Sequence, residues 1–282
     1  MNAPLIAVPH VEPFFFDVDP GTRFCLYHAP NPQLEPRGTI LYVHPFAEEL
    51  NKTRRMASLQ SRAFAAMGYA VLQVDLFGCG DSCGDFHSGR WDQWKRDLAA
   101  AADWLDARDS GPLHLWGVRL GGLLAIDFAT TRKVEGILLW QPFLNGRTCI
   151  NQFLRLRLAA GMDGTGPGAP RSTAALRAAL AAHGRLEVAG YDLECAMVGP
   201  IDACEAIHLK PLPCTVHWFA SGTPGARRLA TGAARLAERW APLGVDLHFH
   251  PVDGVPFWAT SDIAECPALL AATAEVFARA AP

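Results

Sequence analysis

The residues best placed to do chemistry surround a short glycine frame, Gly117-Val118-Arg119-Leu120-Gly121. The frame has the spacing G-x-S-x-G, in which small glycines let a strand turn sharply into a helix and expose the central side chain. The central residue of that motif is a serine that attacks a carbonyl, but here it is Arg119. Because arginine stays protonated at physiological pH, it cannot act as the nucleophile. The frame therefore predicts the turn and leaves the chemistry open.

A second group of polar side chains follows a β-rich run that ends at His44 and consists of Glu48, Glu49, Asn51, Arg54 and Arg55. If a helix starts near Thr53, both arginines lie in its first turn, where positive charge opposes the helix dipole by roughly 0.3–1 kcal/mol each. Two kinds of compensation are expected. Either the glutamates pair with these arginines or with Arg119, or the arginines bind an anionic ligand together with the N-terminus of the helix after the glycine frame.

A few other side chains could replace the missing serine. Ser82 and Cys79 lie in a glycine-rich loop and would need a neighbouring base, so they are weak candidates. His248 and His250 alternate along a strand, so both side chains should point to one face of the sheet. They are either half-buried strand residues, which is the favoured interpretation, or a base that reaches the glycine frame.

The elements that must position these residues alternate between strand and helix. The pattern predicts an α/β fold with a mostly parallel eight-stranded sheet and helices on both faces. The alternation stops in a helix-rich stretch, which we expect to form a helical cap insertion over residues 146–209. Residues 1–145 and 210–282 should form the core domain. Strands are expected at 14–19, 23–28, 39–44, 70–77, 113–118, 137–141, 215–220 and 245–251, and core helices at 56–67, 91–107, 120–130, 226–240 and 264–280.

Composition excludes several functional classes. The 282 residues carry a net charge of −3 without a long run of like charge, so a nucleic-acid-binding arm is not expected. No apolar run approaches the ~20 residues of a membrane span, and the first residues do not resemble a secretory signal. The eight cysteines form no C-x-x-C pair, which favours a reduced, cytoplasmic protein without a metal site. The phosphate-binding glycine motifs of nucleotide cofactors are missing, so no cofactor is expected.

The order of these parts resembles the α/β-hydrolase fold over nearly the whole chain. Several local strings also resemble the second hydrolase family associated with the exosortase A system, whose members occur in bacterial exopolysaccharide and exosortase loci. This resemblance implies a hydrolase that acts on ester or thioester bonds. The strings that carry it are residues 44–56, 75–82, 116–121, 152–157 and 256–258.

A working catalytic triad in this fold follows the chain order serine, acid, histidine. The acid is expected directly after residues 215–220, where the chain reads Ser-Gly-Thr-Pro. The histidine is expected within residues 252–260, where Trp258 lies and could line a pocket or plug it. Backbone N–H groups of Phe46 and Leu120 should form the oxyanion hole, and they do not depend on side-chain identity.

Two functions remain open. In the first, the protein is a hydrolase in which Arg119 binds or polarises the substrate and a non-standard group activates water. In the second, it is a binding protein that holds a small anionic acyl, sugar-derived or carrier ligand. We expect Arg119 at a strand-to-helix turn facing the cap, paired with Glu48 or Glu49. The expected pocket consists of His44, Glu48, Glu49, Asn51, Arg54, Arg55, Arg119 and Trp258.

Overall fold

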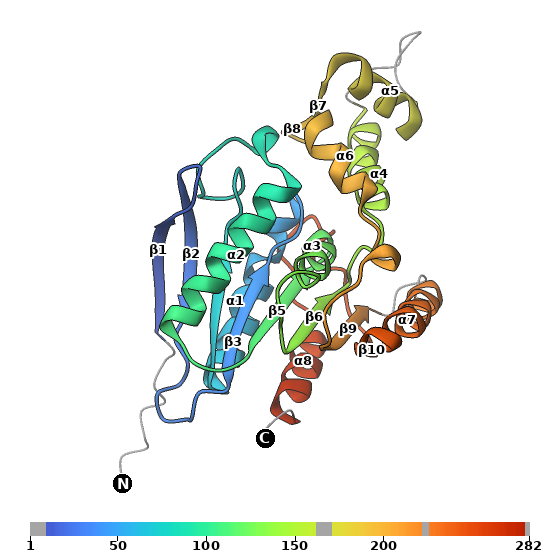
Figure 1. Ribbon diagram of the computed structural model, residues 1–282. Coiled ribbons are helices and arrows are strands. Elements are labelled where there is room, and N and C mark those ends of the chain that lie inside the picture. Colours follow the sequence, from blue (N-terminus) through green and yellow to red (C-terminus); the bar gives the residue numbers. More distant parts are fainter. Residues whose placement is uncertain (1–9, 162–170, 222–225, 280–282) are drawn as a thin grey trace.

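The computed structural model describes residues 10–161, 171–221 and 226–279. One eight-stranded sheet dominates it, with the strand order β1-β2-β4-β3-β5-β6-β9-β10 (Figure 1). β1 and β4 each pair with β2 in antiparallel fashion, and the other neighbouring strands are parallel. The predicted mostly parallel eight-stranded sheet is therefore confirmed. The strands are β1 (Val11–Asp17), β2 (Thr22–His28), β3 (Gly38–Val43), β4 (Tyr69–Val74), β5 (Leu113–Val118), β6 (Gly136–Trp140), β9 (Thr215–Ser221) and β10 (Asp246–Val252).

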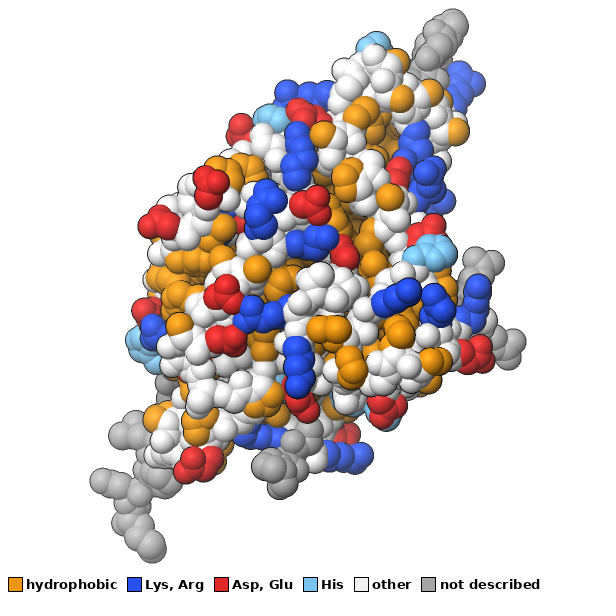
Figure 2. All heavy atoms as spheres, in the orientation of Figure 1, with side chains coloured by type: hydrophobic (Ala, Val, Ile, Leu, Met, Phe, Trp, Pro, Cys, Tyr) orange, Lys and Arg blue, Asp and Glu red, His pale blue; other side chains and the backbone are white. Residues whose placement is uncertain are grey.

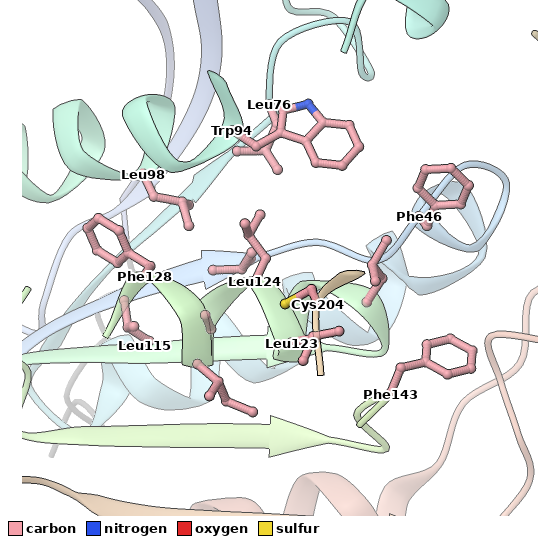
Figure 3. Packing of buried hydrophobic residues seen from close by; sticks show 14 of the residues in the cluster. Phe46, Leu76, Trp94, Leu98, Leu115, Leu123, Leu124, Phe128, Phe143 and Cys204 are labelled. Carbon is pink, nitrogen blue, oxygen red and sulfur yellow. The ribbon is translucent and has the colours of Figure 1, made fainter. Parts of the chain in front are cut away.

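Helices cover both faces of this sheet, as expected. One face packs against α1 (Glu49–Ala66) and α8 (Pro267–Arg279), and the other against α2 (Trp91–Arg108), α3 (Leu120–Phe128) and α7 (Ala226–Trp240). Figure 3 shows the second interface, where side chains of α2 and α3 meet those of the central strands. Every residue of β3, β4 and β6 is buried, because strands covered on both faces read as continuous apolar runs.

Between β6 and β9 the chain leaves the sheet and forms a separate group of elements, here called the insertion. Figure 1 shows these elements at one end of the molecule. The insertion contains a β-hairpin that the sequence pattern did not predict, in a stretch expected to be helical. Its turn is Ala189-Gly190, and both residues have positive φ, as a two-residue type I′ turn requires. The elements are α4 (Gly146–Ala159), α5 (Thr173–His183), β7 (Arg185–Val188), β8 (Tyr191–Glu194), α6 (Cys195–Ala203) and a 3₁₀ turn (Ala206–His208).

The start of α1 differs from the expectation. The helix begins at Glu49 rather than near Thr53, because Leu50 and Thr53 are buried and extend its packed face toward the N-terminus. Arg54 and Arg55 therefore lie in the second turn, and the first turn carries an acidic residue. The predicted conflict between these arginines and the helix dipole was wrong, since Glu49 at the N-terminus interacts favourably with the dipole.

The described part of the chain contains no helix that is long and apolar enough to cross a membrane. Within the same residues, no group of three or more His, Cys, Asp or Glu side chains could hold a metal ion. Figure 2 shows acidic and basic side chains interspersed on the face that it draws.

We expect the fold to lose stability when the pH falls from about 6.5 to about 4. Burial lowers the pKa of His28, His114 and His217 to about 4. In this pH window the unfolded chain binds protons that the native protein excludes, so the free energy of unfolding decreases as the pH falls. His28 alone should account for about 2–3 kcal/mol. Urea unfolding at pH 7.0, 5.5 and 4.5 measures the effect.

In His28→Gln, unfolding should take up one proton fewer, so the free energy of unfolding should depend less steeply on pH. Gln73 donates its side-chain amide to Nε2 of His28 over 3.1 Å, and a glutamine oxygen at the same place can accept that bond. An unchanged pH dependence in His28→Gln would show that this histidine is not the source.

Candidate functional site

Arg119 lies at the sharp turn between β5 and α3, as the glycine frame predicted. Its backbone has φ 55° and ψ −117°, a conformation that residues other than glycine rarely adopt. Strain of this kind costs about 1–3 kcal/mol and persists only where the surroundings impose it. Here the backbone of Arg119 donates to the carbonyl of Trp140 and accepts from the amides of Gly122 and Phe143, all within 3.1 Å.

The two glycines of the frame are required by close backbone contacts. A Cβ atom at Gly121 would lie 2.2 Å from the carbonyl oxygen of Val43 and 2.4 Å from that of His44. A Cβ atom at Gly117 would lie 2.5 Å from Cα of Gly122. Any larger residue would therefore push α3 away from the ends of β3 and β5. This explains why the frame survives although its central residue has changed.

The Arg119 guanidinium is held from several sides. Its Nε donates to both carboxylate oxygens of Glu49 over 3.2 and 3.3 Å, and one terminal nitrogen donates to Oε1 of Glu49 over 3.2 Å. The same terminal nitrogen donates to Oε1 of Gln152 in α4 over 3.2 Å, and the other donates to the Gln141 carbonyl over 3.4 Å. The expected pairing of Arg119 with Glu48 or Glu49 is therefore found, with Glu49 as the partner.

Two aromatic rings pack against this ion pair. The Arg119 guanidinium carbon lies 4.1 Å from the ring centre of Phe143 and 5.1 Å from that of Trp258, in cation–π geometry. The exposed fraction is 7% for the Arg119 side chain and 15% for that of Glu49. Burial raises the pKa of Glu49, while the neighbouring guanidinium acts in the opposite direction. The pair is thus largely shielded from water.

A small cavity of about 100 Å³ adjoins this ion pair and is here called the elbow pocket. It is smaller than the ~300–1,000 Å³ of typical ligand pockets. Side chains of the β3–α1 loop, α1, α4 and the loop after β10 line it, so it lies between the sheet and the insertion. The lining residues include Phe46, Glu48, Glu49, Lys52, Gln152, Phe153 and Trp258.

The turn at Arg119 between β5 and α3 is here called the elbow. The expected oxyanion-hole residues lie together beside it. Phe46 and Leu120 both line a narrow space next to Gly121. Among the described residues, neither backbone N–H donates a hydrogen bond. Figure 3 places the Phe46 ring beyond the ends of the strands. Both N–H groups are therefore free of described partners, at the positions where the sequence predicted an oxyanion hole.

His44 has a structural role. Its Nδ1 donates to the Pro45 carbonyl over 2.7 Å, and its Nε2 accepts from the Leu76 amide over 3.2 Å. Both ring nitrogens are thereby used, and burial lowers the pKa of His44, so the ring is neutral. It ties the loop after β3 to the loop after β4 and offers no free group to a ligand.

A larger cavity of about 440 Å³, here called the loop cavity, lies on the other side of the β3–α1 loop. Asn51 and Arg54 of α1, Asp81 of the loop after β4 and Tyr191 of β8 line it. Arg54 donates to Asp75 over 2.9 Å and makes no other hydrogen bond with the described residues. Its remaining N–H groups are therefore available to a ligand in this cavity.

The structure separates the polar residues that the sequence analysis grouped into one pocket. Glu48 pairs with Lys52 over 3.2 Å at the rim of the elbow pocket. Arg55 pairs with Glu265, which precedes α8, and lines neither cavity. Arg55 points elsewhere because it follows Arg54 in the helix, so its side chain lies about 100° further around the axis.

The loop candidates for a nucleophile are buried in structural contacts. Ser82 accepts a hydrogen bond from the Phe24 amide and donates to the carbonyl of Asp75. Burial raises the pKa of the Cys79 thiol, with Asp75 and Asp97 acting in the same direction. A thiol with a raised pKa is a poor nucleophile, because the thiolate is the reactive form.

His248 and His250 share a face of the sheet, as the alternation predicted, but they associate with other residues. His250 lies 3.1 Å from the ring of His217, and His248 lies 2.9 Å from the Asp246 carboxylate. No described contact joins either histidine to Arg119. β10 is an edge strand two positions away from β6, which explains the separation.

Three residues of the site were missed by sequence reasoning. Gln152 lies in a string that carried the family resemblance, but its contact with Arg119 was not foreseen. Phe143 and Tyr191 carried no recognisable signal. At the expected acid position, residues 222–224 lie outside the described residues. In the expected histidine loop, Trp258 is buried against Arg119.

Comparisons with solved structures show where this fold has been seen. Est1E from Butyrivibrio proteoclasticus with bound ferulic acid has a TM-score of 0.61 at 16% identity, covering 94% of this chain and 96% of that one. Mouse alpha/beta hydrolase domain-containing protein 10 has a TM-score of 0.62 at 16% identity, covering 96% and 100%. An alpha-beta serine hydrolase homologue from Coxiella burnetii has a TM-score of 0.54 at 12% identity, covering 95% and 96%. At these identities the likeness shows the fold alone.

The family assignment depends on sequence. Among curated proteins, none matches this chain. Residues 34–189, more than half of the chain, match the family described as serine aminopeptidase, S33. That segment includes the β3–α1 loop, the glycine frame and α4. The chain thus has the α/β-hydrolase fold and belongs to the serine aminopeptidase S33 family.

Proposed function

We propose that this protein is a non-hydrolytic member of its family that binds a small anionic acyl or sugar-derived ligand beneath the insertion, which acts as a cap. The observation that carries the proposal is the placement of the Arg119 guanidinium at the elbow, paired with Glu49 and bonded to Gln152. A protonated guanidinium at this position cannot attack a carbonyl.

The ligand class is inferred from the two cavities beside the elbow. The elbow pocket is lined by the aromatic rings of Phe46 and Phe153, which suits the acyl part of a small ligand, while Lys52 in its wall is paired with Glu48. In the loop cavity, Arg54 and Asn51 can donate hydrogen bonds to an anionic or hydroxyl-rich group. Because Tyr191 and Gln152 come from the insertion, ligand binding would hold the cap against the core.

We further propose a cytoplasmic role in exosortase-associated exopolysaccharide metabolism. The strings at residues 44–56, 116–121 and 152–157 support this setting. They also supply much of the site, namely the β3–α1 loop, the elbow and the α4 residue that contacts Arg119. The eight cysteines are free thiols and six of them are buried, which is compatible with a reducing compartment.

Hydrolysis of an ester or thioester is the second candidate function, and one arrangement favours it. The Phe46 and Leu120 amides could hold an oxyanion, and the raised pKa of Glu49 makes it a better base than an ordinary carboxylate. In this alternative Arg119 binds or polarises the substrate carbonyl, and Glu49 activates a water molecule. The bidentate pairing of Glu49 with Arg119 opposes this role, because it stabilises the charged carboxylate.

We expect the purified protein to remain unlabelled by a fluorophosphonate probe and to leave p-nitrophenyl acetate, butyrate and an acyl-thioester unhydrolysed. The probe reports a serine activated by a base, and Ser82 is committed to backbone contacts. Arg119→Ser should gain no esterase activity, because His44 beside the elbow already uses both ring nitrogens in hydrogen bonds, and His248 and His250 make no described contact with Arg119. Intact-protein mass spectrometry and chromogenic assays measure both results.

Two outcomes would contradict the binding proposal. Stoichiometric fluorophosphonate labelling would reveal an activated serine. Ester turnover that disappears in Glu49→Gln but persists in Ser82→Ala would assign water activation to Glu49 and favour the hydrolytic alternative. Glu48→Gln is the matched control, because Glu48 pairs with Lys52 and does not contact Arg119.

A further inference from the structure

A further cavity lies at the other end of the sheet, around the amino ends of the parallel strands, and is here called the amino-end cavity. Its volume is about 1010 Å³, and Tyr69, His114 and Thr215 at the starts of β4, β5 and β9 line it. His114 and Arg119 flank β5 from opposite ends, five residues apart, which corresponds to roughly 16 Å along a strand. This cavity is therefore separate from the elbow pocket.

Apolar side chains form most of the wall. Met67 follows the end of α1, Val276 and Phe277 belong to the last turns of α8, and Ile137 comes from β6. The rings of Tyr69, His114 and Phe277 pack edge to face, with centres 5.5 to 5.8 Å apart. A cavity of this size with mainly apolar walls and few polar groups has the character of a small-molecule site.

Two polar groups in the wall have unused hydrogen-bonding capacity. Tyr69 lines the cavity, and its hydroxyl, which solvent can reach, has no hydrogen-bond partner among the described residues. The imidazole of His114 likewise makes no hydrogen bond with them. The Tyr69 hydroxyl and the His114 ring can therefore each exchange a hydrogen bond with a molecule in the cavity.

The charges around the cavity restrict what that molecule can be. Arg37 lies over the Tyr69 ring, with its guanidinium carbon 4.9 Å from the ring centre, and donates to the Phe277 carbonyl over 2.7 Å. Glu35 and Glu135 also line the cavity, so acidic groups outnumber the single cation. Burial keeps the His114 ring neutral by lowering its pKa. An anion would meet net repulsion, while an uncharged oxygen could accept from the Tyr69 hydroxyl.

We propose that the amino-end cavity is a second ligand site, which binds an uncharged, mainly apolar molecule carrying one hydrogen-bonding oxygen, such as an aliphatic alcohol or an alkylphenol. The oxygen would lie between Tyr69 and His114, and the apolar part along Met67, Ile137 and Phe277. This site shares no residue with the elbow pocket or the loop cavity. The inference goes beyond the proposed function and does not depend on it.

Calorimetric titration of the full chain with three probes of equal length, 1-octanol, octanoate and octylammonium, tests the ligand class. We expect 1-octanol to bind at least about tenfold more tightly than either ion, because transfer of an unpaired charge into an apolar cavity is unfavourable. Tighter binding of octanoate or octylammonium than of 1-octanol would overturn the proposed class.

Variants test the location. Tyr69→Phe should weaken 1-octanol binding about tenfold, the equivalent of one hydrogen bond. Ala66→Trp should abolish it, because Ala66 lies in the wall and a large ring there would fill part of the cavity. Tyr27→Phe is the matched control, since the Tyr27 hydroxyl bonds to Asp109 and does not line the cavity. It should leave the affinity unchanged.

Three results would overturn the site. The first is 1-octanol binding that survives Ala66→Trp but is lost in Phe153→Ala, which would place the probe in the elbow pocket. The second is equal weakening by Tyr69→Phe and Tyr27→Phe, which would indicate a general loss of stability. The third is a concentration-dependent dimer, measured by sedimentation, that Ala66→Trp dissociates, which would make the cavity a contact between two copies of the chain. None of these results bears on the fluorophosphonate-labelling and ester-hydrolysis assays, which test the proposed function separately.

Discussion

Glu49→Ala is expected to lower the free energy of unfolding by about 3 kcal/mol or more. Removing one partner of a buried ion pair leaves the other charge uncompensated, which typically costs about 3–5 kcal/mol. Arg119 is 7% exposed in its side chain, and the rings of Phe143 and Trp258 enclose its guanidinium. Glu49 supplies three of its hydrogen bonds. Urea unfolding followed by tryptophan fluorescence measures the loss.

The neighbouring residue provides a control for this change. Glu48→Ala removes a carboxylate at the preceding position, but the Glu48–Lys52 pair is 30% and 26% exposed. Exposed pairs contribute ~0–1 kcal/mol, so this variant should stay close to the wild type. The double variant Glu49→Leu, Arg119→Met should recover much of the stability, because apolar residues of similar volume can replace a buried pair. Equal effects of Glu48→Ala and Glu49→Ala would refute the buried-pair account.

Asp97→Ala is expected to have an effect of at least the same size. Asp97 pairs with Arg23 over 2.8 Å, and both side chains are fully buried. Its second carboxylate oxygen accepts from the Phe77 amide over 2.7 Å, and Gln93 donates to the first over 2.9 Å. The substitution would leave a buried guanidinium without its counter-charge, at about 3–5 kcal/mol.

This prediction also concerns the site, because Phe77 lies in the loop after β4, and the next residues of that loop line the loop cavity. Without Asp97 the loop should become more mobile, which is measurable as faster hydrogen exchange in residues 77–82. Asp103→Ala is the matched control on the same helix. Asp103 pairs with Arg132 but is 67% exposed, so its removal should cost less than about 1 kcal/mol. Unchanged hydrogen exchange in Asp97→Ala would show that Asp97 does not hold the loop.

The local sequence pattern alone was sufficient to predict the sheet and the elbow turn at Arg119. Apolar strand runs alternating with amphipathic helices can be satisfied by a parallel sheet covered on both faces, because each element must bury its apolar side. The turn at Arg119 was likewise predictable, since Gly117 and Gly121 allow a close approach that no other residue permits. The hairpin β7–β8 was not recognised, because short polar strands around Ala189-Gly190 carry little periodicity.

The sequence by itself determined that Arg119 ends a strand at the carboxyl edge of the sheet and cannot be a nucleophile. Only the tertiary structure decided that Glu49 rather than Glu48 is its partner, and that Gln152 and Trp258 complete its surroundings. The reason is physical. A backbone turn depends on residues adjacent in the chain, whereas these side chains meet because helices and loops far apart in sequence pack over the same strand ends.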